Sequence, residues 1–173
     1  MAEAQLPPAV SFIARSGTGK TTLVTQIISE LKARGYKVGA IKHDAHKFEI
    51  DHHGKDSYRF TEAGADSMLI SSSSKLALVK QHPHPPEIDE LIAAYFADVD
   101  IVLVEGFKRV GLPKIEVYRS EHCTSLLSRG EHRDPQLLAV ATDCDLQLDV
   151  PMLNLNQPAE VVDFLVANLL PKS

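Results

Sequence analysis

The sequence has few cysteines, no excess of positive charge and no long hydrophobic run. Two cysteines in 173 residues supply neither a disulfide framework nor the ligand spacing of a zinc site, so free thiols in a reducing compartment are expected. A net charge of -5 argues against a nucleic-acid-binding protein that relies on a basic surface. No apolar stretch could span a bilayer, and the N-terminus lacks the features of a secretory signal. We therefore expect a cytoplasmic protein that binds neither nucleic acid nor membranes.

The composition that remains is that of an ordinary globular domain. Hydrophobic residues make up 44% of the chain and charged residues 24%, which is enough apolar material for a well-formed core. No internal repeat or linker divides the sequence. We therefore expect residues 1–173 to form a single nucleotide-binding domain, with its core at about residues 9–170.

A functional pattern lies near the start of the chain. An apolar run at residues 10–13 is typical of a buried parallel strand, and Leu23, Ile27 and Leu31 lie on one face of a predicted helix. Between them stands Ala14-Arg15-Ser16-Gly17-Thr18-Gly19-Lys20-Thr21. A strand, a glycine-bearing loop and a helix in this order are the context of a phosphate-binding P-loop, although the general pattern has glycine where this chain has Ala14.

The residue types in this loop suit a polyphosphate. Gly17 and Gly19 can adopt positive φ, so successive backbone N–H groups can converge on phosphate oxygens at the helix N-terminus. Lys20 is expected to reach the β and γ oxygens, and the Thr21 hydroxyl is expected to ligate Mg²⁺. The residues expected at the nucleotide are Ser16, Gly17, Thr18, Gly19, Lys20, Thr21 and Thr22.

A second motif joins a buried strand to an acid. The apolar run at residues 101–104 is followed by Glu105, and in P-loop proteins an acid at this position acts on Mg²⁺ directly or through water. Aspartate is more usual there. Because glutamate has a longer side chain, Glu105 could orient a water bound to Mg²⁺ rather than contact the metal itself. The alternative is an acid that ends a strand and has no function. The P-loop earlier in the chain favours the interpretation that Glu105 acts on Mg²⁺.

The polar segment 42–57 is expected to be a loop at the carboxyl edge of the sheet, where ligands bind in open α/β folds. Its four histidines, within 43–53, lack the spacing of a structural zinc site, so a solvated loop is favoured over a metal site. Asp44 and Asp56 in this segment are candidates to join the Mg²⁺ shell. A second polar loop, 119–135, is likewise expected to be solvated, with contact of Arg119, Arg129 and Arg133 to an anionic partner as the alternative.

The remaining periodicity predicts a three-layer α/β fold with a mostly parallel sheet. The segments 68–70 and 76–79 are expected to form a hairpin that adds antiparallel strands to this sheet. Asp143 follows a late strand and is a candidate reader of guanine, since one carboxylate can accept both N1–H and N2–H₂. The Asn and Lys common near such an acid are missing, so an acid that caps a turn is an equal alternative.

The motifs together resemble the molybdopterin-guanine dinucleotide biosynthesis protein B family, MobB. The resemblance is carried by residues 14–23, by Lys42-His43 with Gly54-Lys55-Asp56-Ser57, by residues 103–108 and by residues 139–143. It covers about residues 9–170. The Lys-His and Gly-Lys-Asp-Ser pair, with Val-Glu-Gly-Phe-Lys, is much more specific than the P-loop alone.

This resemblance implies a P-loop NTPase-like fold that binds GTP and Mg²⁺, with weak GTPase activity in which Lys20 and Glu105 act. It also implies a homodimer with a sheet continuous across its interface. The implied partner is the guanylyltransferase MobA, which joins GMP to molybdopterin to form the guanine dinucleotide molybdenum cofactor. Two alternatives stay open: an ATP-dependent small-molecule kinase, and an adaptor that binds nucleotide only to fix its shape.

Overall fold

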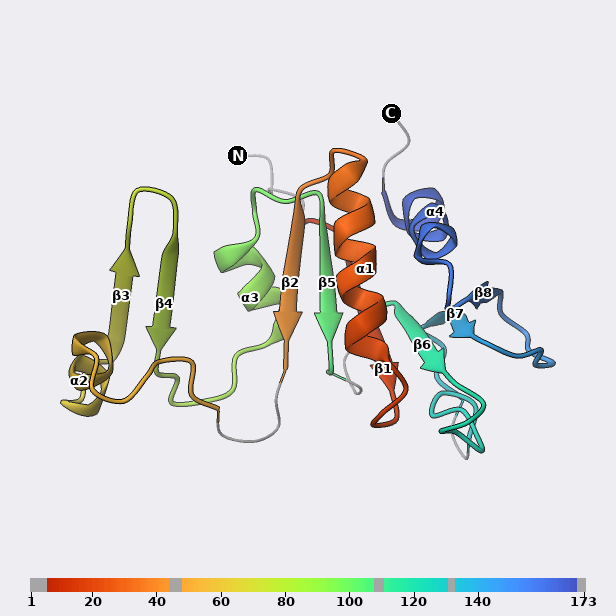
Figure 1. The fold of residues 1–173 in the computed structure, drawn as a ribbon, viewed down its shortest axis with the longest axis horizontal. Coiled ribbons are helices and arrows are strands. Elements are labelled where there is room, and N and C mark those ends of the chain that lie inside the picture. Colours follow the sequence, from red (N-terminus) through yellow and green to blue (C-terminus); the bar gives the residue numbers. More distant parts are fainter. Residues whose placement is uncertain (1–5, 44–47, 108–110, 131–132, 171–173) are drawn as a thin grey trace. The chain divides into compact units, whose positions relative to one another are not determined.

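The computed structural model describes residues 6–43, 48–107, 111–130 and 133–170 (Figure 1). The chain divides into two compact units, one made of Met1–His43 with Leu91–Ser173 and the other of Asp44–Glu90. We call the first the α/β unit and the second the hairpin unit, and describe each by itself. The expectation of a single domain stays a prediction. Nowhere in the described ranges is a helix both long enough and apolar enough to cross a membrane.

A parallel sheet forms the centre of the α/β unit. Its strand order is β2-β5-β1-β6-β7-β8, and each neighbouring pair is parallel. The carboxyl ends of all its strands therefore meet at one edge, which is where ligands bind in open α/β sheets. The strands are β1 (Ala9–Ala14), β2 (Val38–Lys42), β5 (Ile101–Glu105), β6 (Lys114–Tyr118), β7 (Leu137–Thr142) and β8 (Met152–Asn154).

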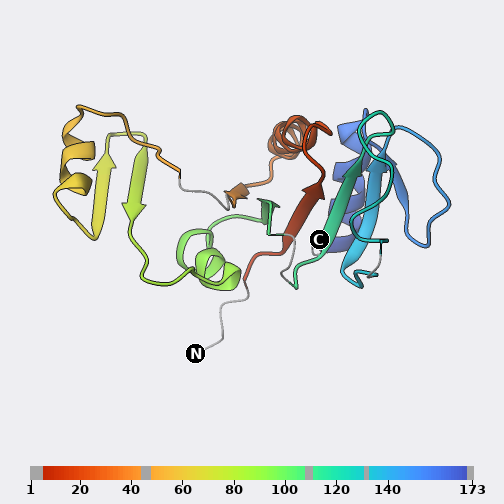
Figure 2. The same cartoon turned by 90° about the horizontal axis from the view of Figure 1, so that it is seen from below.

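Helices cover both faces of this sheet. On one face, α1 (Lys20–Ala33) and α4 (Pro158–Leu169) share a core with alternate residues of the strands. On the opposite face lie residues 91–95, which end α3 (Ile88–Tyr95) (Figure 2). Just beyond α3, Phe96 packs so closely over Gly39 of β2 that a Cβ there would lie 2.4 Å from its ring. The predicted three-layer arrangement is thus confirmed.

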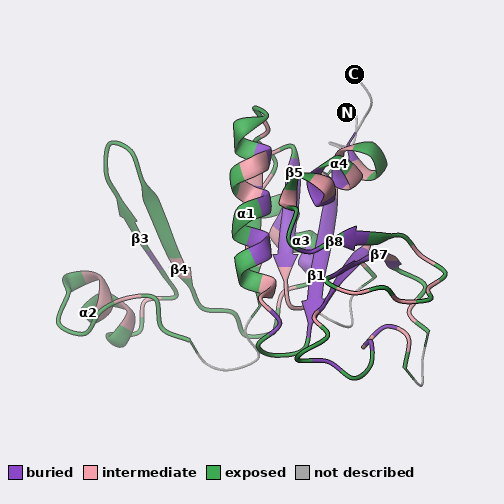
Figure 3. Cartoon of the chain, turned by 45° about the vertical axis from the view of Figure 1, so that its right-hand side comes forward, coloured by how far each residue is buried: buried purple, intermediate pink, exposed green. Residues whose placement is uncertain are grey.

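Burial follows the apolar periodicity of the sequence. Every residue of β1 is buried, as expected for a strand with neighbours on both edges and helices on both faces. On α1 the buried residues are Leu23, Val24, Ile27 and Leu31, which form one stripe, while the rest of the helix is half-buried or exposed (Figure 3). Gly35, with a φ of +91°, follows the helix as its C-terminal glycine.

The hairpin unit holds α2 (Asp56–Glu62), β3 (Ser67–Ser71) and β4 (Leu76–Lys80). The predicted hairpin is present, with Leu69 opposite Leu78 in an antiparallel register. Within the described part of the chain, however, β3 and β4 pair only with each other and form a separate two-stranded sheet. The expected antiparallel strands therefore form a sheet of their own, and each neighbouring pair of the main sheet is parallel.

Candidate functional site

Residues 14–22 wrap around an open pocket at the carboxyl end of β1. The pocket has a volume of about 570 Å³ and is lined by these residues together with Glu105. Gly17 and Gly19 both have a φ of +83°, a conformation that glycine adopts at little cost. Thr18 is buried, and its hydroxyl donates to the Arg15 carbonyl at 3.1 Å. The loop therefore has the concave shape, lined by backbone at a helix N-terminus, that binds anions.

Lys20, Thr21 and Glu105 meet beside this pocket. Glu105 ends β5, which pairs with β1 so that Phe12 is opposite Glu105. The Thr21 hydroxyl lies 3.1 Å from each oxygen of the Glu105 carboxylate, and the Lys20 Nζ lies 3.3 Å from Oε1. The side chains of Lys20 and Glu105 are only 19% and 16% exposed, so bulk water screens their charges weakly. The structure thus brings together the three residues that the sequence assigned to Mg²⁺ and phosphate.

The donor set here fits the ligands that the sequence implies. A carboxylate and a hydroxyl are the hard oxygen donors that Mg²⁺ takes in proteins, usually together with phosphate oxygens and water. A lysine beside backbone amides fits the phosphates themselves. When bound, the metal would neutralise charge between phosphate groups, and Thr21 and Glu105 are the residues placed to hold it.

The backbone at the end of β5 and just after it, in the second motif, is held by Ser11 and His43. Gly106 has a φ of +100°, and its carbonyl accepts a hydrogen bond from the Ser11 hydroxyl at 2.8 Å. The His43 N–H donates to the Glu105 carbonyl at 2.8 Å. The His43 ring lies 4.1 Å from the ring of Phe107, which itself has a positive φ of 48°. The Lys-His and Glu-Gly-Phe motifs are therefore neighbours in space, and together they set the position of Glu105.

Asp143 lies at the same edge of the sheet, after β7, but its carboxylate is already engaged. One oxygen accepts the Ser120 N–H at 2.9 Å, and the other lies 3.5 Å from Nη1 of Arg119. The Ser120 N–H, more than the Arg119 charge, keeps the pKa of Asp143 below its ordinary value despite partial desolvation. In this structure Asp143 therefore belongs to a local network of the segment that follows β6.

Arg119 makes a contact that sequence reasoning did not predict. We expected it in a solvated loop, yet its Nε donates to the Thr18 carbonyl in the P-loop at 3.3 Å and its side chain is 28% exposed. The expectation of a solvated arginine is thus wrong for this residue. The available signal was its position directly after β6, because β6 pairs with β1 and so ends beside the P-loop.

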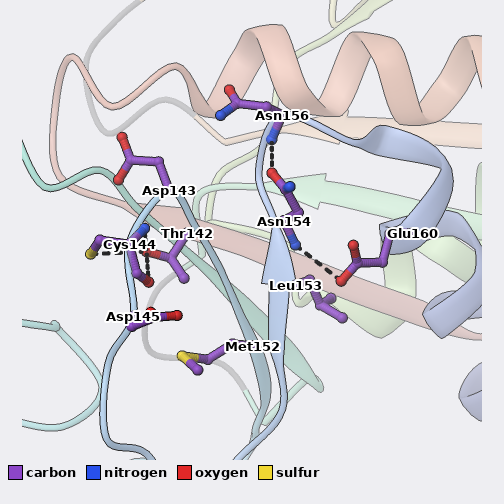
Figure 4. A pocket seen from close by; sticks show the side chains of 9 residues that line it. All are labelled: Thr142, Asp143, Cys144, Asp145, Met152, Leu153, Asn154, Asn156 and Glu160. Atoms are coloured by element: carbon purple, nitrogen blue, oxygen red, sulfur yellow. Dashed lines mark hydrogen bonds between the residues drawn. The ribbon is translucent and has the colours of Figure 1, made fainter.

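A second pocket, of about 470 Å³, opens where β7 and β8 end (Figure 4). Its polar wall is ordered by two hydrogen bonds: the Asn156 N–H donates to Asn154 Oδ1 at 2.9 Å, and the Asn154 N–H donates to Glu160 Oε1 at 3.1 Å. Sequence reasoning identified only Asp143 in this wall. The pocket is lined by Thr142, Asp143, Cys144, Asp145, Met152, Leu153, Asn154, Asn156 and Glu160.

The two remaining metal candidates lie elsewhere. Asp44 lies outside the described residues. Asp56 begins α2 in the hairpin unit, where its largely exposed carboxylate lies 3.6 Å from Arg59. Over the described ranges, no group of three or more His, Cys, Asp or Glu side chains is arranged to hold a metal. A metal role for Asp56 stays a prediction.

Comparison with known proteins gives the family. The chain matches the family described as molybdopterin guanine dinucleotide synthesis protein B over residues 9–143. It is 39% identical over 171 residues to the molybdopterin-guanine dinucleotide biosynthesis adapter protein of Escherichia coli, covering 96% of this chain and 95% of that protein. The adapter protein of Haemophilus influenzae is 36% identical over 159 residues, covering 91% and 87%. The solved structure of Bacillus subtilis MobB has a TM-score of 0.73 at 25% identity, covering 95% and 99%. The resemblance seen in the sequence is confirmed: the chain belongs to the molybdopterin guanine dinucleotide synthesis protein B family.

Proposed function

We propose that this chain is an adapter protein of molybdopterin-guanine dinucleotide biosynthesis that binds GTP with Mg²⁺ in the pocket lined by residues 14–22. The observation that carries the proposal is the meeting of Lys20, Thr21 and Glu105 at that pocket, from two motifs far apart in the sequence. Relatives that align over most of their length are named as adapter proteins of this pathway. Family membership supplies the pathway, and the pocket supplies the ligand class.

Each residue of the pocket has a proposed role. The backbone amides of residues 16–22 hold the phosphates, which involves Ser16, Gly17, Thr18, Gly19 and Thr22 as well as the two residues that follow. Lys20 neutralises the β and γ charge, Thr21 ligates Mg²⁺, and Glu105 acts on the metal or its water. Without ligands, Lys20 pairs with Glu105 at 3.3 Å. Ligand binding therefore exchanges this ion pair for two others, Lys20 with phosphate and Glu105 with Mg²⁺.

Hydrolysis of GTP is proposed to be slow. Among the described residues that line the pocket, Glu105 is the only carboxylate, and it is committed to Thr21 and the metal. Rapid phosphoryl transfer in P-loop proteins also needs a residue that orients the attacking water. We propose that a partner completes the site, and that this partner is a MobA-like guanylyltransferase acting on molybdopterin. Asp44 and Asp56 stay candidates for the metal shell.

The hairpin unit is proposed to form a homodimer interface with a second copy of the chain. A two-stranded sheet is marginally stable alone in water, because it leaves backbone groups unpaired on both edges. Its strands also expose four large apolar side chains: Leu69, Ile70, Leu76 and Leu78 are 55%, 54%, 62% and 37% exposed. Pairing of edge strands between two copies would extend the sheet and cover these side chains. The proposed location is the cytoplasm, where free thiols such as Cys123 and Cys144 persist.

Isothermal titration with GTP, GDP and ATP tests the nucleotide site. Lys20→Ala should abolish measurable binding, whereas Lys32→Ala, at the other end of α1, should bind as the wild type does. Unchanged GTP affinity in the Lys20 variant would refute the assignment. Preference for ATP over GTP would favour a small-molecule kinase, with residues 42–57 binding the acceptor. Single-turnover assays that release no phosphate, with or without a guanylyltransferase, would favour a nucleotide-dependent adaptor.

A further inference from the structure

Arg119 contacts the P-loop from outside the P-loop motif, and none of the roles proposed above uses it. We propose that Arg119, oriented by Asp143, is a positioning residue of the phosphate site, and that Asp143 supports polyphosphate binding through Arg119 rather than by reading the base. This inference rests on the proposed function, since it requires a polyphosphate in the pocket of residues 14–22.

The position of the guanidinium carries the first step. Arg119 Nε donates to the Thr18 carbonyl at 3.3 Å, and Nη2 lies 3.7 Å from where a Cβ on Gly19 would be. The cation therefore lies against the turn formed by Thr18 and Gly19, both of which line the pocket. It fixes that carbonyl and adds positive charge beside an anion site where, among the lining residues, Arg15 and Lys20 are the other cations.

The second observation is that the Asp143 carboxylate already has partners in the protein. To read guanine, one carboxylate must turn both of its oxygens toward N1–H and N2–H₂ of the base. Here Oδ1 accepts the Ser120 N–H at 2.9 Å, Oδ2 faces Arg119 at 3.5 Å, and the side chain is only 16% exposed. Figure 4 shows the Asp143 carboxylate pointing away from Asn154 and Glu160, which lie on the opposite side of the pocket. Asp143 is thus placed to hold Arg119, which a planar, five-donor guanidinium suits.

The segment that carries Arg119 is itself anchored, so it can hold the loop in place. A second arginine connects it to the P-loop from the other side: Arg15 donates to the Ser125 carbonyl at 3.3 Å and to its hydroxyl at 3.0 Å. Beneath the segment, the buried Glu116 accepts the N–H groups of Leu127 at 2.6 Å and Ser128 at 3.0 Å. The residues 119–128 thus form a buttress for the P-loop, with Arg119 as its charged contact.

Binding of GTP and of inorganic tripolyphosphate to the full chain separates the two roles of Asp143. Arg119→Gln and Asp143→Asn should each weaken both ligands by a similar factor, about tenfold for the loss of one charge-assisted contact. The double variant should be no weaker than Arg119→Gln alone, because Asp143 acts through Arg119. The matched control is an arginine–aspartate pair outside the pocket lining, Arg133 with Asp149, whose Gln and Asn variants should bind both ligands normally.

Four outcomes are decisive. Loss of GTP binding but not tripolyphosphate binding in Asp143→Asn would show that Asp143 reads the base and would overturn the inference, as would unchanged affinities in Arg119→Gln. Arg119→Lys keeps the charge but cannot bridge Thr18 and Asp143, so wild-type binding by the lysine variant would overturn the positioning role. If Arg119→Gln fails to fold, Arg119→Lys is the variant to measure in its place. If the wild-type chain binds neither ligand, the proposed function fails, and this inference with it.

Discussion

The Thr21 hydroxyl lies 3.1 Å from both carboxylate oxygens of Glu105, which stands 84 residues later in the chain. Thr21 is the second residue of α1, and Glu105 is the last residue of β5, the strand that pairs with β1. Their meeting means that the hydroxyl and the carboxylate are in place before any ligand binds. Preorganised groups of this kind need little reorganisation when the ligand arrives.

Glu105→Gln should uncouple GTP binding from Mg²⁺. The enhancement of GTP affinity by Mg²⁺ should fall by about 10–100-fold, the cost of losing a residue that holds a metal or its water. In EDTA the variant should bind GTP at least as well as the wild type, because Lys20 is no longer paired with a carboxylate. Titration with and without Mg²⁺ measures both quantities. Glu30→Gln, a carboxylate on α1 that pairs with Arg34, is the control, and an undiminished Mg²⁺ effect in Glu105→Gln would contradict the metal role.

Gly106→Ala should destabilise the protein more than Gly35→Ala, although both glycines have positive φ. Left-handed backbone alone costs a non-glycine residue roughly 1–2 kcal/mol, which is the loss expected at Gly35, where a Cβ meets nothing within 4 Å. At Gly106 the Cβ would lie 2.8 Å from the His43 carbonyl, which adds roughly 1–3 kcal/mol of overpacking. Urea unfolding measures the difference. Equal losses would show that the close approach to His43 is not important.

Lysine at Leu69 and Leu76 should convert a dimer into monomers. Both leucines are more than half exposed on the hairpin, so charged replacements leave the monomer intact. In a dimer they remove apolar contact, and the like charges of the two copies repel each other. Sedimentation equilibrium measures the mass. Ser73→Lys adds the same charge at the turn without removing apolar surface and should stay dimeric. A wild-type chain that is monomeric throughout would refute the homodimer.

Asp149→Asn should lower stability at neutral pH but not in strong acid. The Arg129 and Arg133 guanidiniums hold the pKa of Asp149 well below its ordinary value of 3.8. A lowered pKa in the folded state stabilises the protein fully above that ordinary value, and the stabilisation is lost as pH falls towards the folded pKa. Urea midpoints of wild type and variant should therefore differ from pH 7 to about pH 4 and converge below that. Asp145→Asn, for a carboxylate with no ion pair among the described side chains, should shift little at any pH.

The sequence predicted those parts of the fold that local patterns determine. The apolar runs of β1 and β5 and the helical spacing in α1 all lie where expected. Predicting the hairpin was correct for its two strands but not for its place in the sheet. A run of four to five apolar residues indicates a strand, yet nothing in it specifies which edge it pairs with.

Sequence reasoning predicted the parts of the candidate site that lie within a single short motif, but not the contacts between motifs. The loop at residues 14–22 is local, so its glycines and Lys20 could be identified from spacing alone. The contact of Arg119 with Thr18 joins positions 101 residues apart, and only the strand order places them together. The engagement of Asp143 by the Ser120 N–H is equally invisible in sequence, since a backbone donor leaves no residue-type signal.

The strands β2 and β5 are adjacent in the sheet, yet the whole hairpin unit stands between them in sequence. The chain leaves the parallel sheet after β2, forms the hairpin unit and returns before β5. This excursion places no strand between β2 and β5, which pair directly. Such an insertion can vary in length and composition while the pocket of residues 14–22 keeps its scaffold. On the proposed assignment, the excursion holds the contact with a second copy and the sheet edge holds the nucleotide, so each can change in evolution without the other.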